Sequence, residues 1–213
     1  MNGFFRKTWW IAGLAIMAGC QSQPKPAPVL GSARVVADFD SYTLRRIGLL
    51  PLEGVDPALA ESRDMATTLA AEFAARTGLE VYVLSASEIS EVPALEPHRQ
   101  GRFDMRTVIG LGKRHRLDGL LVASVVEHKA YPPQRLALQV DLVSTETGMS
   151  LWFGQVQADA SQGETQRAVE GWVTEANSTS DSNWQVVLIS PKRFFRFACN
   201  QVFRQFAKAE RAS

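Results

Sequence analysis

The residue types that most often carry out chemistry are scattered along this chain. His98, His115 and His128 each stand alone, with no second His or Cys at the spacing of a metal site. Glu127 and His128 place an acid beside a base, but neighbouring residues on a strand point to opposite faces and cannot act together. We therefore predict no metal site and no histidine-based acid–base pair, and we interpret the three histidines as surface residues.

Motifs for nucleophilic catalysis and for phosphate binding are also missing from the sequence. A serine nucleophile would need a sharp turn of the type Gly-x-Ser-x-Gly, which the chain does not contain. Gly110 and Gly112 lack the third glycine of a dinucleotide motif, and Lys113 lacks the Ser or Thr that follows the lysine of a phosphate loop. We predict that the protein is not an enzyme and has no cofactor. An enzyme built on residues outside these patterns is the alternative.

The N-terminus has the three-part layout of an export signal. Two basic residues at positions 6 and 7 precede an apolar run from Trp9 to Met17, which the small pair Ala18-Gly19 closes. A membrane-spanning helix needs about 20 apolar residues, and this run is far shorter. We predict that residues 1–19 are a cleaved signal peptide rather than a membrane span.

Cys20 follows the small pair, and Met17-Ala18-Gly19-Cys20 resembles the lipobox of bacterial lipoproteins. The resemblance implies that the chain is cut before Cys20, that its sulfur carries a diacylglyceryl group and that the new amine is acylated. Several acyl chains hold a protein on a membrane stably. In that family an aspartate after the cysteine favours the inner membrane, so Gln21 favours the outer membrane. An ordinary signal peptide followed by a chance cysteine is the alternative.

Beyond Cys20 the sequence predicts a tether and then one domain. Prolines at positions 24, 26 and 28 favour extended backbone, so we interpret residues 20–34 as a lipidated, proline-rich tether. A chain of 213 residues with 46% hydrophobic side chains can build one core, and we predict a single periplasmic domain over residues 35–208. The 23 basic and 22 acidic residues nearly balance, which does not favour nucleic-acid binding. Cys199 is left without a disulfide partner in the lipidated chain and is expected to pack as an apolar residue.

The first half of this domain predicts a strand, a helix and a second strand. The apolar run 46–52 is typical of a buried strand. Asp56 and Pro57 supply a cap and a first-turn proline for a helix that ends at Gly78. Its apolar positions at helical spacing are Leu59, Ala66, Leu69, Ala70 and Phe73. With a strand over 80–84, the segment is a βαβ unit with parallel strands.

The second half predicts a helix and three antiparallel strands. The expected elements are a loop over 86–101 with one helical turn at 87–92, a helix over 104–115, a strand over 120–126, a strand over 136–142, a glycine turn at 145–148 and a strand over 151–158. In the middle strand Leu136, Leu138, Val140 and Leu142 alternate with polar residues such as Gln139 and Asp141. The fold class is therefore α/β, in an α+β arrangement with a mixed sheet: a βαβ unit, a helix and a three-stranded antiparallel meander, with helices packed on the sheet.

The C-terminal part predicts two more helices. One covers about residues 164–175, a polar loop follows at 177–183, and Ser190-Pro191 opens the last helix. The apolar positions of the last helix are Phe194, Phe195, Phe197, Ala198, Cys199, Val202 and Phe206, and its basic ones are Lys192, Arg193, Arg196, Arg204, Lys208 and Arg211. We expect this face to pack in the core; lying on an anionic membrane is the alternative. Trp152, Trp172 and Trp184 are likewise expected to pack, with anchoring of a partner as the alternative.

Three stretches, residues 46–52, 108–125 and 138–152, resemble one family of envelope lipoproteins. They are similar to the domain shared by the curli-secretion channel lipoprotein, the lipoprotein activators of peptidoglycan synthases and the N-terminal domain of the Tol-system translocation protein. The resemblance covers about residues 44–160 and implies the fold predicted above.

The resemblance, together with the expected anchor, also implies a function. We expect an outer-membrane-anchored adaptor that binds another envelope protein, in cell-wall synthesis, secretion or trafficking. A ring-forming, homo-oligomeric subunit of an outer-membrane secretion assembly is the alternative. A pore is not expected, because the strands of a membrane barrel need about 9 to 11 residues each and the strands of this chain already belong to its own sheet.

Overall fold

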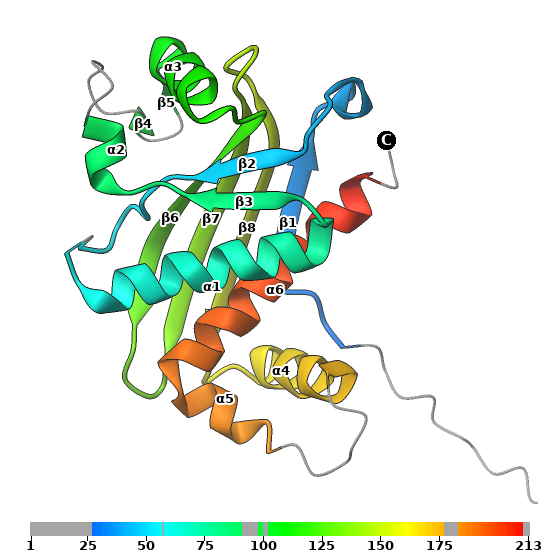
Figure 1. Cartoon of the computed structure of the whole chain (residues 1–213). Coiled ribbons are helices and arrows are strands. Elements are labelled where there is room, and N and C mark those ends of the chain that lie inside the picture. The colour runs from blue at the N-terminus through cyan, green and yellow to red at the C-terminus, as the bar shows by residue number, and fades with distance from the viewer. Residues whose placement is uncertain (1–26, 57, 91–97, 100–101, 177–182, 211–213) are drawn as a thin grey trace, which may run out of the picture.

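A six-stranded mixed sheet organises the described part of the molecule. The computed structural model describes residues 27–56, 58–90, 98–99, 102–176 and 183–210 (Figure 1). Six strands lie in the order β1-β8-β7-β6-β2-β3. Their bounds are Gly31–Val35 for β1, Arg46–Leu49 for β2, Glu80–Val83 for β3, Gly119–Lys129 for β6, Arg135–Ser144 for β7 and Ser150–Asp159 for β8. A separate pair joins β4 (His98–Arg99) to β5 (Arg102–Phe103).

Six α-helices and one short 3-10 turn accompany these strands in the described part of the chain. Their bounds are Phe39–Ser41 for the 3-10 turn, Ala60–Thr77 for α1, Ala86–Ser90 for α2, Met105–His115 for α3, Gly163–Ala176 for α4, Gln185–Ile189 for α5 and Pro191–Glu210 for α6. No helix among the described residues is long and apolar enough to span a bilayer. The predicted α/β class with helices on a mixed sheet is confirmed.

The βαβ unit is confirmed, although its helix starts later than expected. Strand β2 pairs in parallel with β3 on one side and with β6 on the other, which explains why its residues are apolar on both faces. Helix α1 ends at Gly78, whose φ of 75° suits glycine. The Asp56 carboxylate accepts the N–H of Ala58 in a turn rather than capping α1. Leu59 precedes the helix and is 54% exposed, so its predicted place in the apolar stripe is wrong.

The antiparallel meander is confirmed in β6, β7 and β8. Gly148 closes the β7–β8 turn with a φ of 70°, as the turn chemistry requires. Strand β6 runs three residues beyond its predicted end at position 126. It does so past a bulge between Val125 and Glu127, where an extra residue breaks the register.

The sheet begins inside the segment expected to be a tether. Residues 31–35 form β1, which pairs antiparallel with β8 from Gly31↔Val156 to Val35↔Trp152. Neither this strand nor α5 was predicted. The predicted signal peptide at 1–19, Cys20 and the tether up to residue 26 lie outside the described residues. So do Pro57, the end of the turn expected at 87–92, and residues 177–182 of the expected loop.

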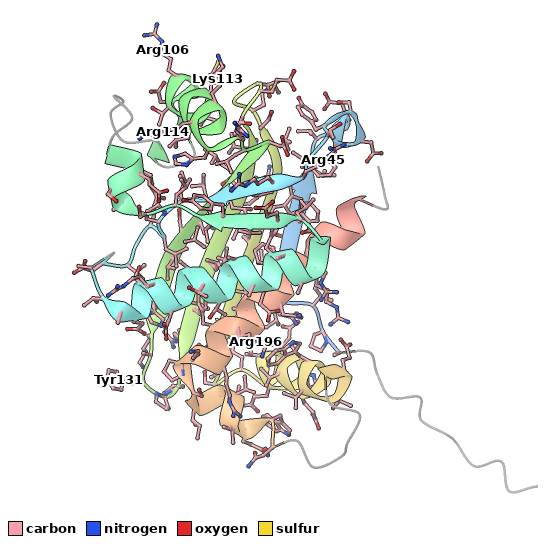
Figure 2. All side chains as sticks on the ribbon, viewed as in Figure 1. Arg45, Arg106, Lys113, Arg114, Tyr131 and Arg196 are labelled. Carbon is pink, nitrogen blue, oxygen red and sulfur yellow. The ribbon has the colours of Figure 1, made fainter. Side chains whose placement is uncertain are left out.

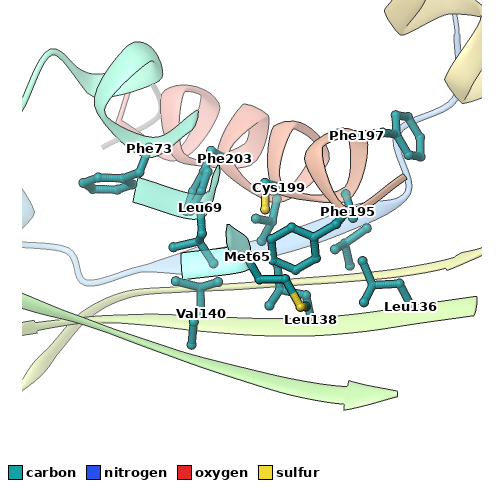
Figure 3. Packing of buried hydrophobic residues seen from close by; sticks show 14 of the residues in the cluster. Met65, Leu69, Phe73, Leu136, Leu138, Val140, Phe195, Phe197, Cys199 and Phe203 are labelled. Atoms are coloured by element: carbon teal, nitrogen blue, oxygen red, sulfur yellow. The ribbon is translucent and has the colours of Figure 1, made fainter. Parts of the chain in front are cut away.

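Helices α1 and α6 cover one face of the sheet and build the main core. Figure 3 shows Leu69 of α1 and Phe203 of α6 over Val140 of β7. The Phe203 ring lies 5.1 Å from that of Phe73 between ring centroids, at an angle of 69°. The predicted core face of α6, including Cys199, is buried. The alternative in which its phenylalanines lie on a membrane is therefore wrong, because the sheet and α1 already bury them.

The opposite face of the sheet is covered only in part. Helix α3 packs Val108 and Leu111 against Leu120 and Val122 of β6, and this second, smaller core lies at the β2 end of the sheet. Helices α2 and α3 both lie at this end, and β7, β8 and β1 extend well away from them (Figure 1). The rest of this face has no helical cover in the part of the chain that the structure describes.

Candidate binding surface

The part of the sheet without helical cover presents polar side chains from four strands, and we call it the open face. Inward residues of β6, β7, β8 and β1 belong to the main core, so the alternate residues between them point outward. The open face consists of Ser32, Arg34, Ser124, Val126, Glu127, Ala137, Gln139, Asp141, Phe153, Gln155 and Gln157. None of these side chains is fully buried.

One row of hydrogen-bonding side chains crosses four strands of the open face. Ser32 of β1 pairs with Gln155 of β8, Gln155 with Gln139 of β7, and Gln139 with Ser124 of β6. The Gln155 amide Nε2 donates to the Ser32 hydroxyl at 3.2 Å, and the Ser124 hydroxyl donates to Glu53 Oε2 at 2.5 Å. Amides and hydroxyls both donate and accept, so this row can bond to a wide range of polar groups.

Two neighbouring grooves lie on the part of this face that is nearest the β6–β7 turn and the start of α4. The first, of about 470 Å³, runs from Ser32 past Gln139 and Gln155 to Val126. The second, of about 550 Å³, continues towards the start of α4. The two share Leu30, Glu127 and Gln157 in their linings, so they lie next to each other. Their rim on one side is the chain just before β1, so the segment that leads to the N-terminus passes beside them.

The charges of the second groove are mostly acidic. Arg135 pairs with Asp159 at 2.9 Å, and the Asp159 carboxylate also accepts from Ser161. Those hydrogen bonds from Ser161 are the main reason that the pKa of Asp159 is lowered. Glu127 and Glu164 line the same groove. The groove therefore carries an excess of negative charge that a cationic group could neutralise.

The part of the open face nearest the β7–β8 turn combines an aromatic ring with charges of both signs. The guanidinium carbon of Arg34 lies 5.6 Å from the centroid of the Phe153 ring, within cation–π range. Phe153 pairs across the strands with Asp141, whose carboxylate accepts from the Ser150 hydroxyl at 3.0 Å. Burial raises the pKa of Asp141, and the Ser150 hydrogen bond opposes that rise. This corner offers both an apolar contact and hydrogen-bonding groups.

A different cluster of titratable groups lies where α2 and α3 meet β3. The Glu88 carboxylate accepts the Tyr82 hydroxyl at 2.5 Å and the Ser85 hydroxyl and backbone N–H at 2.6 and 2.8 Å. The His115 ring stacks on the Tyr82 ring at 5.8 Å between centroids, and its Nδ1 lies 4.0 Å from Glu88. Arg46 donates to the His115 carbonyl, so the cluster ties β2, β3, α2 and the end of α3 together.

The contacts of this cluster indicate a structural role. Hydrogen bonds from the Ser85 hydroxyl and then from Tyr82 lower the pKa of Glu88 to about 2. The Tyr82 pKa is raised, first of all because its proton is held by Glu88. A carboxylate with a pKa near 2 is a weak base at neutral pH, and its oxygens already accept three hydrogen bonds. Glu88 is therefore suited to fixing α2 on β3 rather than to taking a proton from a substrate.

The positions of two histidines agree only in part with what the sequence predicted. The side chains of His115 and His128 are 14% and 21% exposed, so these two are partly buried at the surface rather than fully exposed. His128 points to the α1 side, with Nε2 3.9 Å from Glu61, whereas Glu127 lines the grooves of the open face. The prediction that Glu127 and His128 face opposite sides is confirmed. Within the described residues no group of three or more His, Cys, Asp or Glu side chains could hold a metal ion.

Comparison with known proteins identifies structures with a similar fold but no family for this chain. No family model and no curated protein matches the sequence. Among solved structures the chain is similar to the PelC dodecamer from Paraburkholderia phytofirmans, with 10% identity, a TM-score of 0.41 and coverage of 65% of this chain and 89% of that one. It is also similar to lipoprotein GNA1162 from Neisseria meningitidis, with 18% identity, a TM-score of 0.40 and coverage of 64% and 99%.

A third likeness is to the LpoB C-terminal domain from Salmonella enterica, with 17% identity, a TM-score of 0.37 and coverage of 56% of this chain and 87% of that one. Identities and TM-scores at this level leave the function of the chain to be argued from its own residues.

The described residues that the sequence singled out do not come together in one site. Cys20 lies outside the described residues, so its lipidation stays a prediction. Cys199 is buried in α6, and Trp152 is buried in the same main core, as expected. Trp172 and Trp184 are partly buried against the same core. From the sequence, only the alternation of polar and apolar residues along β7 indicated the open face. The grooves also depend on β1 and on the bulge in β6, and neither has a sequence motif that predicts it.

Proposed function

We propose that this protein is a lipid-anchored, non-catalytic binding module that holds a segment of another envelope protein against its open face. The observation that carries the proposal is the pair of neighbouring grooves across β1, β8, β7 and β6, lined by amide and hydroxyl side chains. An adaptor needs such a surface because specific binding requires hydrogen bonds that orient the partner as well as apolar contacts. Val126, 63% exposed at the rim, supplies an apolar contact.

The chemistry of the groove favours an extended polypeptide with at least one basic side chain. An extended segment presents backbone N–H and C=O groups along its length, and Gln139, Gln155 and Gln157 can bond to both kinds. A basic residue of the segment would meet Glu127 and Glu164 in the second groove. The partner would belong to cell-wall synthesis, secretion or trafficking, as the resemblance of the sequence implies.

The anchor would come from Cys20, fatty-acylated after export, at the periplasmic side of the outer membrane. Val29 and Leu30, which line the second groove, follow Cys20 by nine and ten positions. Anchoring would therefore hold the binding surface near the bilayer, where its effective concentration towards a membrane-bound partner is high.

The absence of catalysis is part of the proposal. Its support is that Glu88, whose pKa is lowered to about 2, is held by Tyr82 and Ser85 and lines neither groove of the open face. Loss of a defined chemical turnover on changing one polar residue of the grooves would contradict it.

Site-specific photocrosslinking tests the binding surface. A photoreactive residue in place of Gln155 should give one discrete adduct in intact cells, because Gln155 is exposed at the centre of the groove. The matched control places the same residue at Ala71, exposed on α1 on the other side of the sheet. The same adduct from both positions, or none from position 155 and its groove neighbours, would exclude the open face as the binding site.

Fractionation tests the anchor separately. Cys20→Ala should move the protein from the outer-membrane fraction to the soluble periplasm or leave it unprocessed, since the acylated sulfur is lost. Cys199→Ala is the control: its thiol is 0% exposed, and burial raises its pKa, so it should not affect fractionation. Mass spectrometry of the native protein that found an unmodified thiol at position 20 would refute the anchor.

A further inference from the structure

The end of the molecule opposite α3 exposes large apolar side chains. It is formed by the β6–β7 turn, α4 and α5, and we call it the tether end (Figure 1). Tyr131 at the tip of the turn is 81% exposed and Ile189 at the end of α5 is 62% exposed. Figure 2 shows Tyr131 projecting from this end, far from the α3 cations Arg106 and Lys113. The Gln134 amide donates to the Leu188 carbonyl at 3.0 Å, so the turn and α5 lie side by side.

The described chain begins at this same end. Ala27 lies against Gly171 of α4: a Cβ added to that glycine would come within 2.3 Å of the Ala27 Cβ. Helix α4 in turn contacts α5. Cys20 precedes Ala27 by seven residues, and an extended chain advances at most about 3.6 Å per residue, so their Cα atoms are separated by no more than about 25 Å. An acyl group on Cys20 would keep the bilayer surface within that distance of α4.

We propose that the tether end rests on the lipid surface, with Tyr131 and Ile189 in the interfacial layer of the bilayer. The proposal depends on the lipid anchor proposed above. Tyrosine is favoured at this layer because its ring is apolar and its hydroxyl is hydrated, and burying isoleucine removes apolar surface from water. The long strands β6, β7 and β8 then stand upright on the membrane and the open face looks sideways along it (Figure 1).

The contact is apolar rather than electrostatic. Two cations near this end are already paired with acids: Lys192 with Asp64 at 3.4 Å and Arg135 with Asp159 at 2.9 Å. Three further exposed cations, Lys129, Arg167 and Arg193, are balanced by the exposed acids Glu164, Glu170 and Glu175 of α4. The described residues of this end therefore carry little net charge to attract anionic headgroups. The contact should therefore form equally on neutral and on anionic lipid.

Spin labelling of the acylated protein in vesicles tests this orientation. Single variants Tyr131→Cys, Ile189→Cys and Met149→Cys carry a nitroxide label; Met149 is 56% exposed in the β7–β8 turn, at the opposite end, and serves as the control. The native Cys199 is buried and should not react. Labels at 131 and 189 should collide several-fold more with oxygen, relative to a water-soluble nickel complex, than the label at 149. The vesicles are pure phosphatidylcholine, and phosphatidylglycerol is added in a second series.

Each outcome decides between defined alternatives. If the protein floats with the vesicles but all three labels are equally accessible to nickel, the anchor stands and the proposed orientation is wrong. If labels at 131 and 189 are protected only with phosphatidylglycerol, the apolar basis of the contact is wrong. If the protein does not float, the lipid anchor itself fails, and the orientation fails with it.

Discussion

The two faces of strand β7 show how one strand serves two purposes. Its inward residues Leu136, Leu138, Val140 and Leu142 are at most 1% exposed and lie under α1 and α6. Between them Ala137, Gln139 and Asp141 face outward, and α3 covers only the far end of this side. The same backbone therefore contributes packing on one side and hydrogen-bonding groups on the other.

The difference places the proposed binding surface on the face that contributes least to stability. Helices α1 and α6 provide the apolar burial that the fold requires, and apolar burial is the main favourable term in folding. An open antiparallel face can remain solvated without cost because its strands satisfy their own backbone hydrogen bonds. Residues on the open face can therefore change to suit a partner with little effect on the stability of the fold.

The largest difference is expected between two phenylalanines. Phe203→Ala on the covered side should lower the free energy of unfolding by about 3–5 kcal/mol, because a ring at 0% exposure that packs on Phe73 and Trp152 leaves a cavity. Phe153→Ala on the open face should cost only about 1 kcal/mol, chiefly its contact with Arg34. Urea unfolding of both variants measures the contrast, and equal losses would mean that the open face contributes to the core.

The stability that α2 contributes by packing on β3 should depend on pH, because Glu88 holds the two together. Its pKa of about 2 in the folded protein lies below the ordinary 4.5, so the ionised carboxylate stabilises the fold above pH 4.5. That contribution is lost as the pH falls from 4.5 towards 2. Glu88→Gln should be less stable than the parent at pH 7 and approach it at low pH. Thermal unfolding across this range gives the result; parallel pH profiles would show that Glu88 does not hold α2.

Two buried glutamines on the covered side should respond in opposite ways to the same change. Gln201 in α6 is 1% exposed, and neither side-chain polar atom has a hydrogen-bond partner among the described residues. Gln201→Met should stabilise the protein by about 1 kcal/mol, because burying an unpaired amide is unfavourable. Gln134 is 2% exposed and donates to the Leu188 carbonyl, so Gln134→Met should destabilise by about 1 kcal/mol. Denaturant midpoints that shift in the same direction would contradict this account.

Much of the fold could be predicted because it is encoded locally. The alternation in β7, Gly78 and Gly148 at positive φ, and Ser190-Pro191 at the start of α6 each act within a few residues. The apolar face of α6 predicted its burial for the same reason. Helical spacing and strand alternation report which side of an element is apolar, and in this chain that side became the core.

The remaining features depend on partners distant in sequence. The alternation of Ser32 and Arg34 with Ala33 and Val35 is present, but five residues are too few to predict β1 without knowing that β8 offers an edge. His115, at the end of helix α3, is partly buried because the Tyr82 ring of strand β3 stacks on it. The grooves likewise combine four strands with a bulge. Of this surface, only the outward direction of Gln139 and Asp141 could be predicted from the sequence.

The smallest effect on stability is expected on the open face, where the effect on binding should be greatest. Gln139→Ala with Gln155→Ala should change the free energy of unfolding by less than about 0.5 kcal/mol per site, because both side chains are exposed. The same double variant should lose the adduct formed by a photoreactive residue at Gln157, since the row that orients the partner is gone. Gln185→Ala, an exposed glutamine on α5, is the matched control and should keep it. A destabilised double variant with an intact adduct would reverse the assignment, making the row part of the scaffold and leaving the partner to bind elsewhere.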